Sequence, residues 1–320
     1  MKNLYCYIAQ GTDPFRNLAA EKYLLDTLPE NGVILYLWQN AQTVVIGSNQ
    51  NAWSECRCAL LQEEGGTLAR RLSGGGAVYH DLGNLNFTFL CAEQDYDLEK
   101  QLSVIALACQ KAGIAAERSG RNDLLAEGKK FSGNAFYHHQ GKAYHHGTLL
   151  IDTDGEKLSR YLTPPKAKLQ AKGVASVRAR VVNLKELSPA LTPQKMAELM
   201  QAAFSEIYGA EPKMLPPIEE QLLDPLAKEF ADPSFLFGRS PQCDMVLEER
   251  FEWGQMELQL TVQKGAIQEV AAYTDAMEHT LAPAVVSALK GAPFTPAGIK
   301  AALASLPHSE DLFALLSRAL

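Results

Sequence analysis

The segment RRLSGGGAVYH, residues 70–80, places two arginines and a serine directly before three consecutive glycines. Glycine backbone offers N–H groups that no Cβ shields, so such a run can approach an anion or a flat ring closely. Arg70 and Arg71 add permanent charge and planar donors suited to phosphate or carboxylate. The segment favours binding of a phosphate or a nucleotide. From the glycines alone, a flexible turn between strands is an equally good interpretation.

Two common phosphate-binding motifs do not explain this run. Gly74, Gly75 and Gly76 are not followed by the Gly-Lys-Ser/Thr ending of a P-loop. The third glycine of the dinucleotide fingerprint would fall on Tyr79. The glycines therefore belong to neither motif.

A second polar cluster combines RNDL at 121–124 with GKKFSGN at 128–134. Side chains alternate along a strand, so Lys129 and Lys130 face opposite ways. A Lys130 that points inward can neutralise a carboxylate and a phosphate together, and Asp123 could hold a Mg²⁺ ion that bridges phosphates. The alternative interpretation of the two lysines is a solvated turn.

Four histidines, His138, His139, His145 and His146, lie close together in the sequence. Neighbouring histidines on a strand point to opposite sides, and no cysteine or carboxylate completes a ligand set. Packed or surface histidines are therefore favoured over a metal site.

Hydrophobic patterns predict an α+β fold, a mixed sheet flanked by helices. Short apolar runs at 33–38 and 43–47 and an alternating stretch at 85–89 indicate strands, and 131–151 has the pattern of a hairpin that turns at Gln140-Gly141. Helices are predicted after Asp13-Pro14 and after Thr192-Pro193.

The C-terminal part forms a second pattern. Prolines crowd the chain after Tyr208, and strict alternation of apolar and polar residues begins near Met245. We expect a catalytic domain over residues 1–244 and a smaller α+β domain over 245–320.

Composition and charge disfavour several classes of protein. The 320 residues carry a formal net charge of −7, which does not suggest bulk binding to nucleic acid or to an anionic membrane. The start of the chain lacks a leader pattern, no apolar run is long enough for a membrane span, and the six cysteines are scattered. These features predict a cytoplasmic protein with reduced thiols.

Taken together, several motifs resemble the lipoate–protein ligase A family. They are RRLSGGGAVYHDLGN at 70–84, RNDL at 121–124, KFSGNA at 130–135, HHGTLL at 145–150 and KGVASVRARV at 172–181. Their order and spacing agree over about residues 1–210, and the combination is far more specific than any single motif. The C-terminal part resembles the accessory domain of the family's long form more weakly.

The resemblance implies a fold related to biotin ligases and an ATP-dependent ligase. The family activates lipoate with MgATP to lipoyl-AMP, releases pyrophosphate and transfers the lipoyl group to one lysine of an acceptor. Acceptors include the lipoyl domains of 2-oxoacid dehydrogenase complexes (their E2 subunits) and the glycine cleavage H protein.

The resemblance also assigns roles to residues. Lys130 is the essential lysine and contacts both substrates. The candidate Mg²⁺ ligand is Asp123, from the residues of the second cluster and not from the resemblance. ATP is expected on Arg71, Gly76, Ala77, Val78 and Tyr79. Lipoate is expected on Arg70, Ser73, Gly74, Gly75 and His80. A loop that closes over the adenylate is expected to contain Lys172, Gly173, Val177, Arg178 and Arg180. Candidates for an apolar lipoate slot are Val44, Val45, Val78 and Phe87.

Three other functions stay open at this point. A lipoyl or octanoyl transferase on the same scaffold would use a cysteine nucleophile, for which Cys91 and Cys109 are the nearest candidates, but neither lies in a motif. A biotin ligase would carry a different glycine-rich signature. A sensor without turnover would be expected to have lost parts of the motif set, which is present here.

Overall fold

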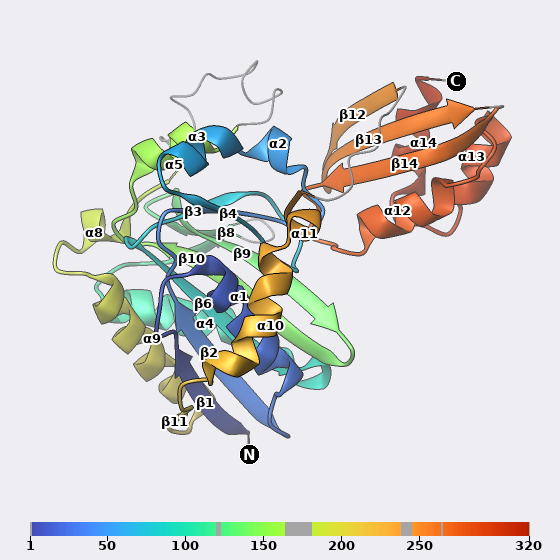
Figure 1. Cartoon of the computed structure of the whole chain (residues 1–320). Helices are drawn as coiled ribbons and strands as arrows, with labels where there is room; N and C mark the ends of the chain where they lie inside the picture. The colour runs from blue at the N-terminus through green and yellow to red at the C-terminus, as the bar shows by residue number, and fades with distance from the viewer. Residues whose placement is uncertain (1, 120–122, 164–180, 238–244, 264, 320) are drawn as a thin grey trace.

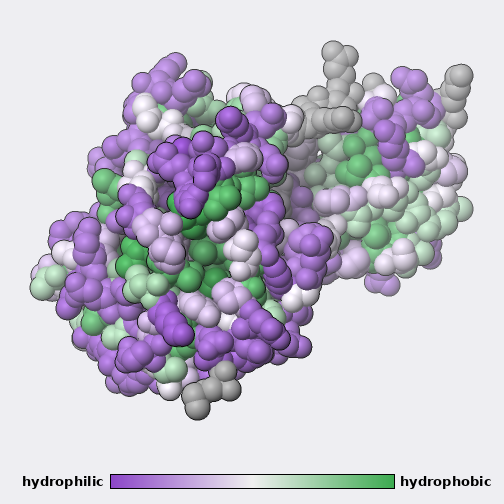
Figure 2. Space-filling model, turned by 60° about the horizontal axis from the view of Figure 1, so that its bottom comes forward, coloured by the Kyte–Doolittle hydropathy of each residue, from purple (hydrophilic) through white to green (hydrophobic). Residues whose placement is uncertain are grey.

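The computed structural model describes residues 2–119, 123–163, 181–237, 245–263 and 265–319. It consists of a larger body with a smaller α+β domain at one side, and the C-terminus lies in the smaller part (Figure 1). On the face shown in Figure 2, apolar side chains gather in the middle of the larger body and polar ones surround them. None of the helices in the described ranges has the length and apolar character that a membrane crossing requires.

The larger body is built on a mixed sheet that has eight strands within the described residues. Strands β11, β1 and β2 run parallel, and the pairs from β2 to β7 are antiparallel. In spatial order the strands are β11 (Lys213–Met214), β1 (Asn3–Ile8), β2 (Gly32–Trp38), β6 (Asn84–Ala92), β10 (Lys142–Leu150), β9 (Lys129–His139), β8 (Asp123–Ala126) and β7 (Glu117–Ser119).

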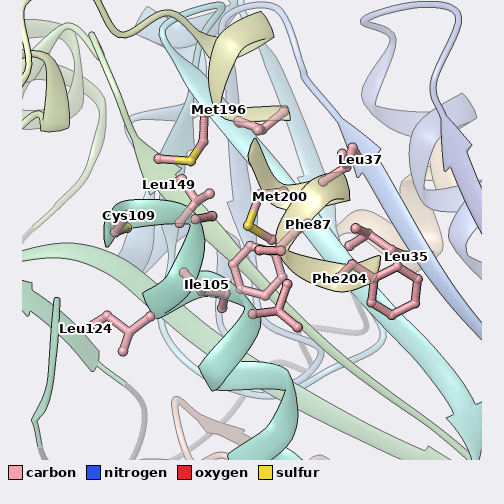
Figure 3. Packing of buried hydrophobic residues seen from close by; sticks show 14 of the residues in the cluster. Leu35, Leu37, Phe87, Ile105, Cys109, Leu124, Leu149, Met196, Met200 and Phe204 are labelled. Carbon is pink, nitrogen blue, oxygen red and sulfur yellow. The ribbon is translucent and has the colours of Figure 1, made fainter. Parts of the chain in front are cut away.

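Two helices, α4 (Leu98–Lys111) and α9 (Pro193–Tyr208), cover one face of this sheet. The side chain of Thr192 caps the start of α9, and Gly209 ends it in the left-handed conformation at φ 73°. One stripe of α9 bears Met196, Met200 and Phe204, which pack in an apolar cluster with residues of the sheet and of α4 (Figure 3).

The opposite face is covered by α1 (Pro14–Asp26), α10 (Glu220–Ala231) and a small sheet of order β4-β3-β5. The small sheet consists of β3 (Thr43–Ile46), β4 (Thr67–Arg70) and β5 (Val78–His80). Val45 and Ala69 of the small sheet join the same apolar cluster as Ile34 and Tyr36 of the large sheet. The glycine run connects β4 to β5 and therefore lies at the edge of the space between the two sheets.

The C-terminal domain is a three-stranded antiparallel sheet packed on helices, with its own apolar core. Its elements are β12 (Met245–Phe251), β13 (Gly254–Gln263), β14 (Ala266–Thr274), α12 (Leu281–Leu289), α13 (Pro296–Leu303) and α14 (Ser309–Ser317). Short elements complete the described chain: α2 (Ala52–Glu55), α3 (Cys58–Glu63), η1 (Glu93–Asp95), α5 (Gly155–Tyr161), α8 (Leu184–Leu187) and α11 (Pro233–Phe237).

The predicted elements agree with this architecture. The hairpin forms from β9 and β10 and turns at Gln140 and Gly141, both at positive φ. The mixed sheet flanked by helices and the smaller α+β domain are confirmed. The proline-rich segment after Tyr208 contains α10 and α11, and α10 packs with Leu223 and Phe230 on the core of the larger body. The boundary between residues 244 and 245 stays a prediction.

Candidate functional site

A pocket of about 130 Å³ lies between the two sheets of the larger body. It combines an apolar wall, a backbone wall from the glycine run and polar groups from β9 and β10. The lining residues are Leu18, Trp38, Val45, Arg71, Gly75, Gly76, Ala77, Val78, His80, Asn86, Lys130, Gly133, Asn134, Ala135, His146, Gly147 and Thr148.

Arg71 organises the glycine loop from inside. Arg71 is 6% exposed, and its guanidinium donates to the carbonyls of Gly74 and Gly76 at 2.7 and 2.8 Å and to Ser73 Oγ at 3.0 Å. Burial lowers the pKa of Arg71 to about 10, which still leaves it charged at neutral pH. A fixed cation thus lies under the loop and lines the pocket.

Arg70 points elsewhere, because consecutive strand residues face opposite sides. Its guanidinium donates to five backbone carbonyls, and the pocket lining does not include it. The acceptors are the carbonyl oxygens of Gly47, Ser48, Gln50, Phe235 and Leu236. These contacts tie the small sheet to α11, and they give no support to the predicted contact of Arg70 with lipoate.

Lys130 lies at the pocket and pairs with Asp123. Its Nζ is 2.7 Å from Asp123 Oδ1, and the two side chains are 39% and 35% exposed. Lys129 is exposed and lies outside the pocket lining. The alternation along β9 therefore distinguishes the two lysines as expected.

A buried hydrogen-bond chain forms the polar end of the pocket. Ser73 Oγ accepts from Arg71, so its O–H is available for Nε2 of His146 at 2.7 Å. Nδ1 of His146 lies 2.8 Å from Glu21 Oε1, which also accepts from Thr88. Glu21 is 2% exposed. A buried carboxylate is stable here because a histidine and a hydroxyl satisfy it.

His80 lies beside Trp38, with its ring 6.0 Å from the indole in an edge-on arrangement. Burial, together with the charge of Arg71, lowers the pKa of His80 to about 3. Its Nδ1 faces the side-chain amides of Asn40 and Asn86, and its buried Nε2 has no partner among the described residues. The imidazole is therefore neutral and holds one unused polar atom.

The other predicted residues divide by the direction in which they face. Gly75, Gly76, Ala77 and Val78 line the pocket, whereas the Tyr79 side chain points away and packs against Tyr161. Ser73 and Gly74 are not part of the lining. Of the apolar candidates, Val45 and Val78 line the pocket, and Val44 and Phe87 lie in core clusters.

The C-terminal domain contacts the glycine loop directly. Gly75 N–H donates to the Ala276 carbonyl at 3.0 Å, and, beside the loop, Thr274 N–H donates to the carbonyl of Asn49 in the turn after β3 at 2.7 Å. A Cβ on Gly74 would lie 2.4 Å from the Ala276 carbonyl oxygen, so this close approach requires glycine. The segment that follows β14 thus rests on the loop.

Sequence reasoning missed several polar residues at the pocket. Asn86 and Thr88 alternate with Phe87 and Phe89 along β6, so the aromatic side chains enter the core and the polar ones face the pocket region. A strand that alternates aromatic residues with short polar residues was the available signal. Glu21, on α1, gave no such signal because one carboxylate on a helix is usually solvated.

Some predicted positions cannot be placed. Lys172, Gly173, Val177, Arg178 and Arg180 lie outside the described residues, as do Arg121 and Asn122. The described residues contain no group of three or more histidine, cysteine or acidic side chains that could hold a metal ion. Asp123 nevertheless fits a nucleotide-bound Mg²⁺, because this ion commonly takes one or two carboxylates and completes its shell with phosphates and waters.

The candidate nucleophilic cysteines are buried. Cys91 and Cys109 are both fully inaccessible, and burial raises the pKa of each thiol to about 12. Figure 3 places Cys109 in the packed core. A thiol of this kind stays protonated at neutral pH and is a poor nucleophile.

Comparison with known families identifies the family of the chain. The sequence model described as "Lipoyl protein ligase A/B catalytic domain" matches residues 13–205. The chain belongs to this family. A second model, "Bacterial lipoate protein ligase C-terminus", matches residues 240–317. The first match covers most of the larger body, and the second covers the smaller domain.

Solved structures of lipoate–protein ligases share the fold. LipL1 of Plasmodium falciparum in complex with lipoate superposes with a TM-score of 0.84 at 26% identity, over 97% of this chain and 98% of that one. A bipartite ligase from Thermoplasma acidophilum, described with its E2 lipoyl domain, gives 0.67 at 24% identity over 77% and 100%. Lipoate-protein ligase A bound with ATP gives 0.66 at 24% identity over 74% and 99%.

Proposed function

We propose that this protein is an ATP-dependent lipoate–protein ligase that forms lipoyl-AMP and pyrophosphate and then lipoylates a lysine of an acceptor domain. The observation that carries the proposal is the composition of one pocket. Lys130, the bare backbone of Gly75 and Gly76, and the apolar side chains of Trp38, Val45 and Val78 line the same space. The lining therefore combines an apolar wall suited to an aliphatic chain with a cation and bare backbone N–H groups suited to anionic groups.

Activation requires two anions to approach. The carboxylate of lipoate and the α-phosphate of ATP repel each other, and the Lys130 ammonium offsets this repulsion and stabilises the charge that develops at phosphorus. The glycine loop, held from below by Arg71, positions the nucleotide. A Mg²⁺ ion held by Asp123 and the phosphates would neutralise phosphate charge.

Transfer requires an uncharged amine and a polarised carbonyl. The acceptor lysine attacks the acyl carbon as a neutral amine, the C–N bond forms, AMP leaves with the electrons of the C–O bond, and the nitrogen releases one proton to give the amide. Lys130 stabilises the oxyanion of the intermediate. Water must be kept away, because the mixed anhydride would otherwise hydrolyse.

The descriptions of similar solved structures support lipoate, ATP and a lipoyl domain as the proposed substrates. The Plasmodium relative is described in complex with lipoate, and lipoate-protein ligase A is described with ATP. The Thermoplasma ligase is described with an E2 lipoyl domain, which favours lipoyl domains of 2-oxoacid dehydrogenases as acceptors here. The glycine cleavage H protein is the second proposed acceptor.

The deciding experiment is lipoylation of a purified apo lipoyl domain with and without ATP, with pyrophosphate release recorded in parallel. We expect modification only with ATP, and pyrophosphate only when lipoate is present. Cys91→Ser and Cys109→Ser should keep this activity, since neither thiol is accessible. Transfer from an acylated carrier protein without ATP, lost in either cysteine variant, would instead establish a transferase.

A further inference from the structure

Two cysteines, Cys56 and Cys58, lie one residue apart on the face of the small sheet that points away from the pocket. Cys56 follows α2 and packs in an apolar cluster with Val44 and Ile46 of β3, whereas Val45 of the same strand lines the pocket. Figure 1 shows α2 and α3, which flank this pair, above the small sheet. Neither cysteine is among the lining residues of the pocket, and the proposed mechanism does not use them.

The backbone at Arg57 brings the two cysteines closer together than an extended chain would. Residues two positions apart in fully extended backbone are about 7 Å from Cα to Cα, whereas a disulfide spans about 4.4–6.8 Å. Arg57 has φ −77° and ψ 71°, which are the dihedral angles of an inverse γ-turn. Because this turn lets one residue hydrogen-bond the residue two positions on, it shortens the separation into the range that a disulfide needs.

The two side chains also lie against each other. Cys58 Sγ is 3.4 Å from the Cys56 carbonyl oxygen and 3.6 Å from the Ala52 carbonyl oxygen, so the side chain of Cys58 folds back over the end of α2. The two thiols are hydrogen-bonded to each other. Rotation of the side chains is therefore enough to join the sulfurs.

The surroundings of the two thiols give them different chemistry. The hydrogen bond from Cys56 lowers the pKa of Cys58, and the same bond, together with burial, raises the pKa of Cys56. Cys58 is partly exposed, whereas Cys56 is 3% exposed. An oxidant can thus reach the more acidic thiol, and a protonated thiol lies beside it. These are the features that distinguish redox-sensitive cysteines from inert ones.

The other described cysteines lack these features. Cys6, Cys91 and Cys109 are fully buried, and burial raises the pKa of each thiol to about 12. Cys243 lies outside the described residues. Within the described ranges, an accessible thiol and a neighbouring thiol thus occur together at Cys56 and Cys58.

We propose that Cys56 and Cys58 form a reversible dithiol–disulfide site for hydroperoxides, with Cys58 as the attacking thiol and Cys56 as the resolving thiol. The Cys58 thiolate attacks one oxygen of hydrogen peroxide, the S–O bond forms, the O–O bond breaks, and hydroxide leaves and takes up the proton that Cys58 had released. Cys56 then attacks the Cys58 sulfur, the S–S bond forms, and the S–O bond breaks. The leaving hydroxide takes the Cys56 proton, so two thiols supply the two electrons that reduce the peroxide to two waters.

The position of Arg57 makes the disulfide directly measurable. Trypsin cuts between Arg57 and Cys58, so a Cys56–Cys58 disulfide holds together the peptide that ends at Arg57 and the peptide that begins at Cys58. Wild-type protein and Cys243→Ser are treated with hydrogen peroxide at pH 7.5, alkylated and digested without reduction. We expect the joined peptides in both proteins after peroxide and their separation by dithiothreitol.

Two results would overturn the site. One is recovery of Cys56 and Cys58 as separate alkylated peptides after peroxide. The other is a Cys58 sulfinic acid without the joined peptides, which would mean that Cys56 does not resolve the sulfenic acid. Joined peptides in the wild type but not in Cys243→Ser would assign the reaction to Cys243 and likewise reject the pair.

Single variants test the two roles. Cys56→Ser should leave Cys58 as a sulfenic acid that dimedone labels, and Cys58→Ser should abolish the labelling. Cys109→Ser is the matched control, since its thiol is buried in the core, and it should give the joined peptides as the wild type does. Labelling of Cys56 in Cys58→Ser would overturn the assignment of roles. The joined peptides are measured in the wild-type protein, so the site stays testable even if a single variant does not fold.

This inference goes beyond the proposed function and does not depend on it. The peptides are analysed without lipoate, ATP or an acceptor domain. A protein that forms the disulfide but does not lipoylate would uphold the site and reject the ligase, and lipoylation without disulfide formation would do the reverse.

Discussion

The ammonium of Lys130 and the carboxylate of Asp123 form an ion pair across neighbouring strands β9 and β8, with Nζ 2.7 Å from Oδ1. Both side chains remain more than a third exposed, so the pair is accessible to ligands and contributes little to stability. In the proposed mechanism Lys130 contacts the reacting anions and Asp123 binds Mg²⁺. Mutation of each residue therefore tests each role by itself.

Lys130→Ala should abolish adenylate formation while lipoate still binds. The ammonium is the one described cation that the proposed mechanism places between the two reacting anions, so its loss should lower lipoate-dependent pyrophosphate release by at least about 100-fold. Lipoate binding, followed by calorimetry, should persist because the apolar wall is unchanged. Lys129→Ala, one residue away and exposed, should behave like the wild type. Normal pyrophosphate release by Lys130→Ala would refute the assignment.

Asp123→Asn should change the response to Mg²⁺. If the carboxylate is a ligand of the nucleotide-bound ion, the Mg²⁺ concentration that gives half-maximal pyrophosphate release should rise several-fold. The measurement is a Mg²⁺ titration at saturating ATP and lipoate. A lower rate with an unaltered Mg²⁺ titration would restrict Asp123 to orienting Lys130.

Gly74→Ala should separate the C-terminal domain from the glycine loop. The new Cβ would meet the carbonyl oxygens of Ala276 and Met277 at 2.4 and 2.6 Å, and backbone cannot yield as a flexible side chain can. Hydrogen exchange at Thr274 and Gly75, whose N–H groups bond across this contact, should become faster. Gly76→Ala is the control, since nothing lies within 4 Å of its Cβ position. Equal exchange in both variants would contradict the prediction.

Arg70→Met should lower the free energy of unfolding by about 3 kcal/mol, because several buried carbonyls lose their donor. Urea denaturation gives this value, and Arg57→Met, which loses one exposed contact to the Arg160 carbonyl, is the control. Arg70→Lys should retain the wild-type KM for lipoate if Arg70 is structural. A large rise in that KM would restore the predicted contact with lipoate.

Stability should decline with acid because two buried histidines stay neutral. Burial lowers the pKa of both His80 and His145 to about 3, whereas the unfolded chain titrates near 6.5. Above pH 6.5 both histidines are neutral in the folded and in the unfolded chain, so they do not lower the free energy of unfolding. As the pH falls toward 3, protonation of the unfolded chain lowers the free energy of unfolding by up to about 1.4 kcal/mol per pH unit for each histidine. Urea midpoints between pH 7 and 4 should show a shallower slope in His80→Gln. An identical slope would mean that His80 does not titrate as described.

Helix starts, turns and strands were largely predictable from the sequence. The Asp13-Pro14 and Thr192-Pro193 pairs, the Gln140-Gly141 turn and the alternation from Met256 each specify a local backbone conformation, and the corresponding elements form. The glycine run and Lys130 were likewise visible as residue types with an obvious chemistry.

Tertiary structure decided which of these groups share a pocket. Arg70 and Arg71 are equivalent in sequence, yet one donates to the Leu236 carbonyl 166 positions away and the other supports the glycine loop. Glu21 and Asn40 carry no local signal, because their partners come from other strands and helices. The sequence by itself determined the elements and the chemical groups, since backbone propensity and side-chain type are local properties. Packing of the two sheets decided burial, charge environment and hydrogen-bond partners, which depend on residues far apart in the chain.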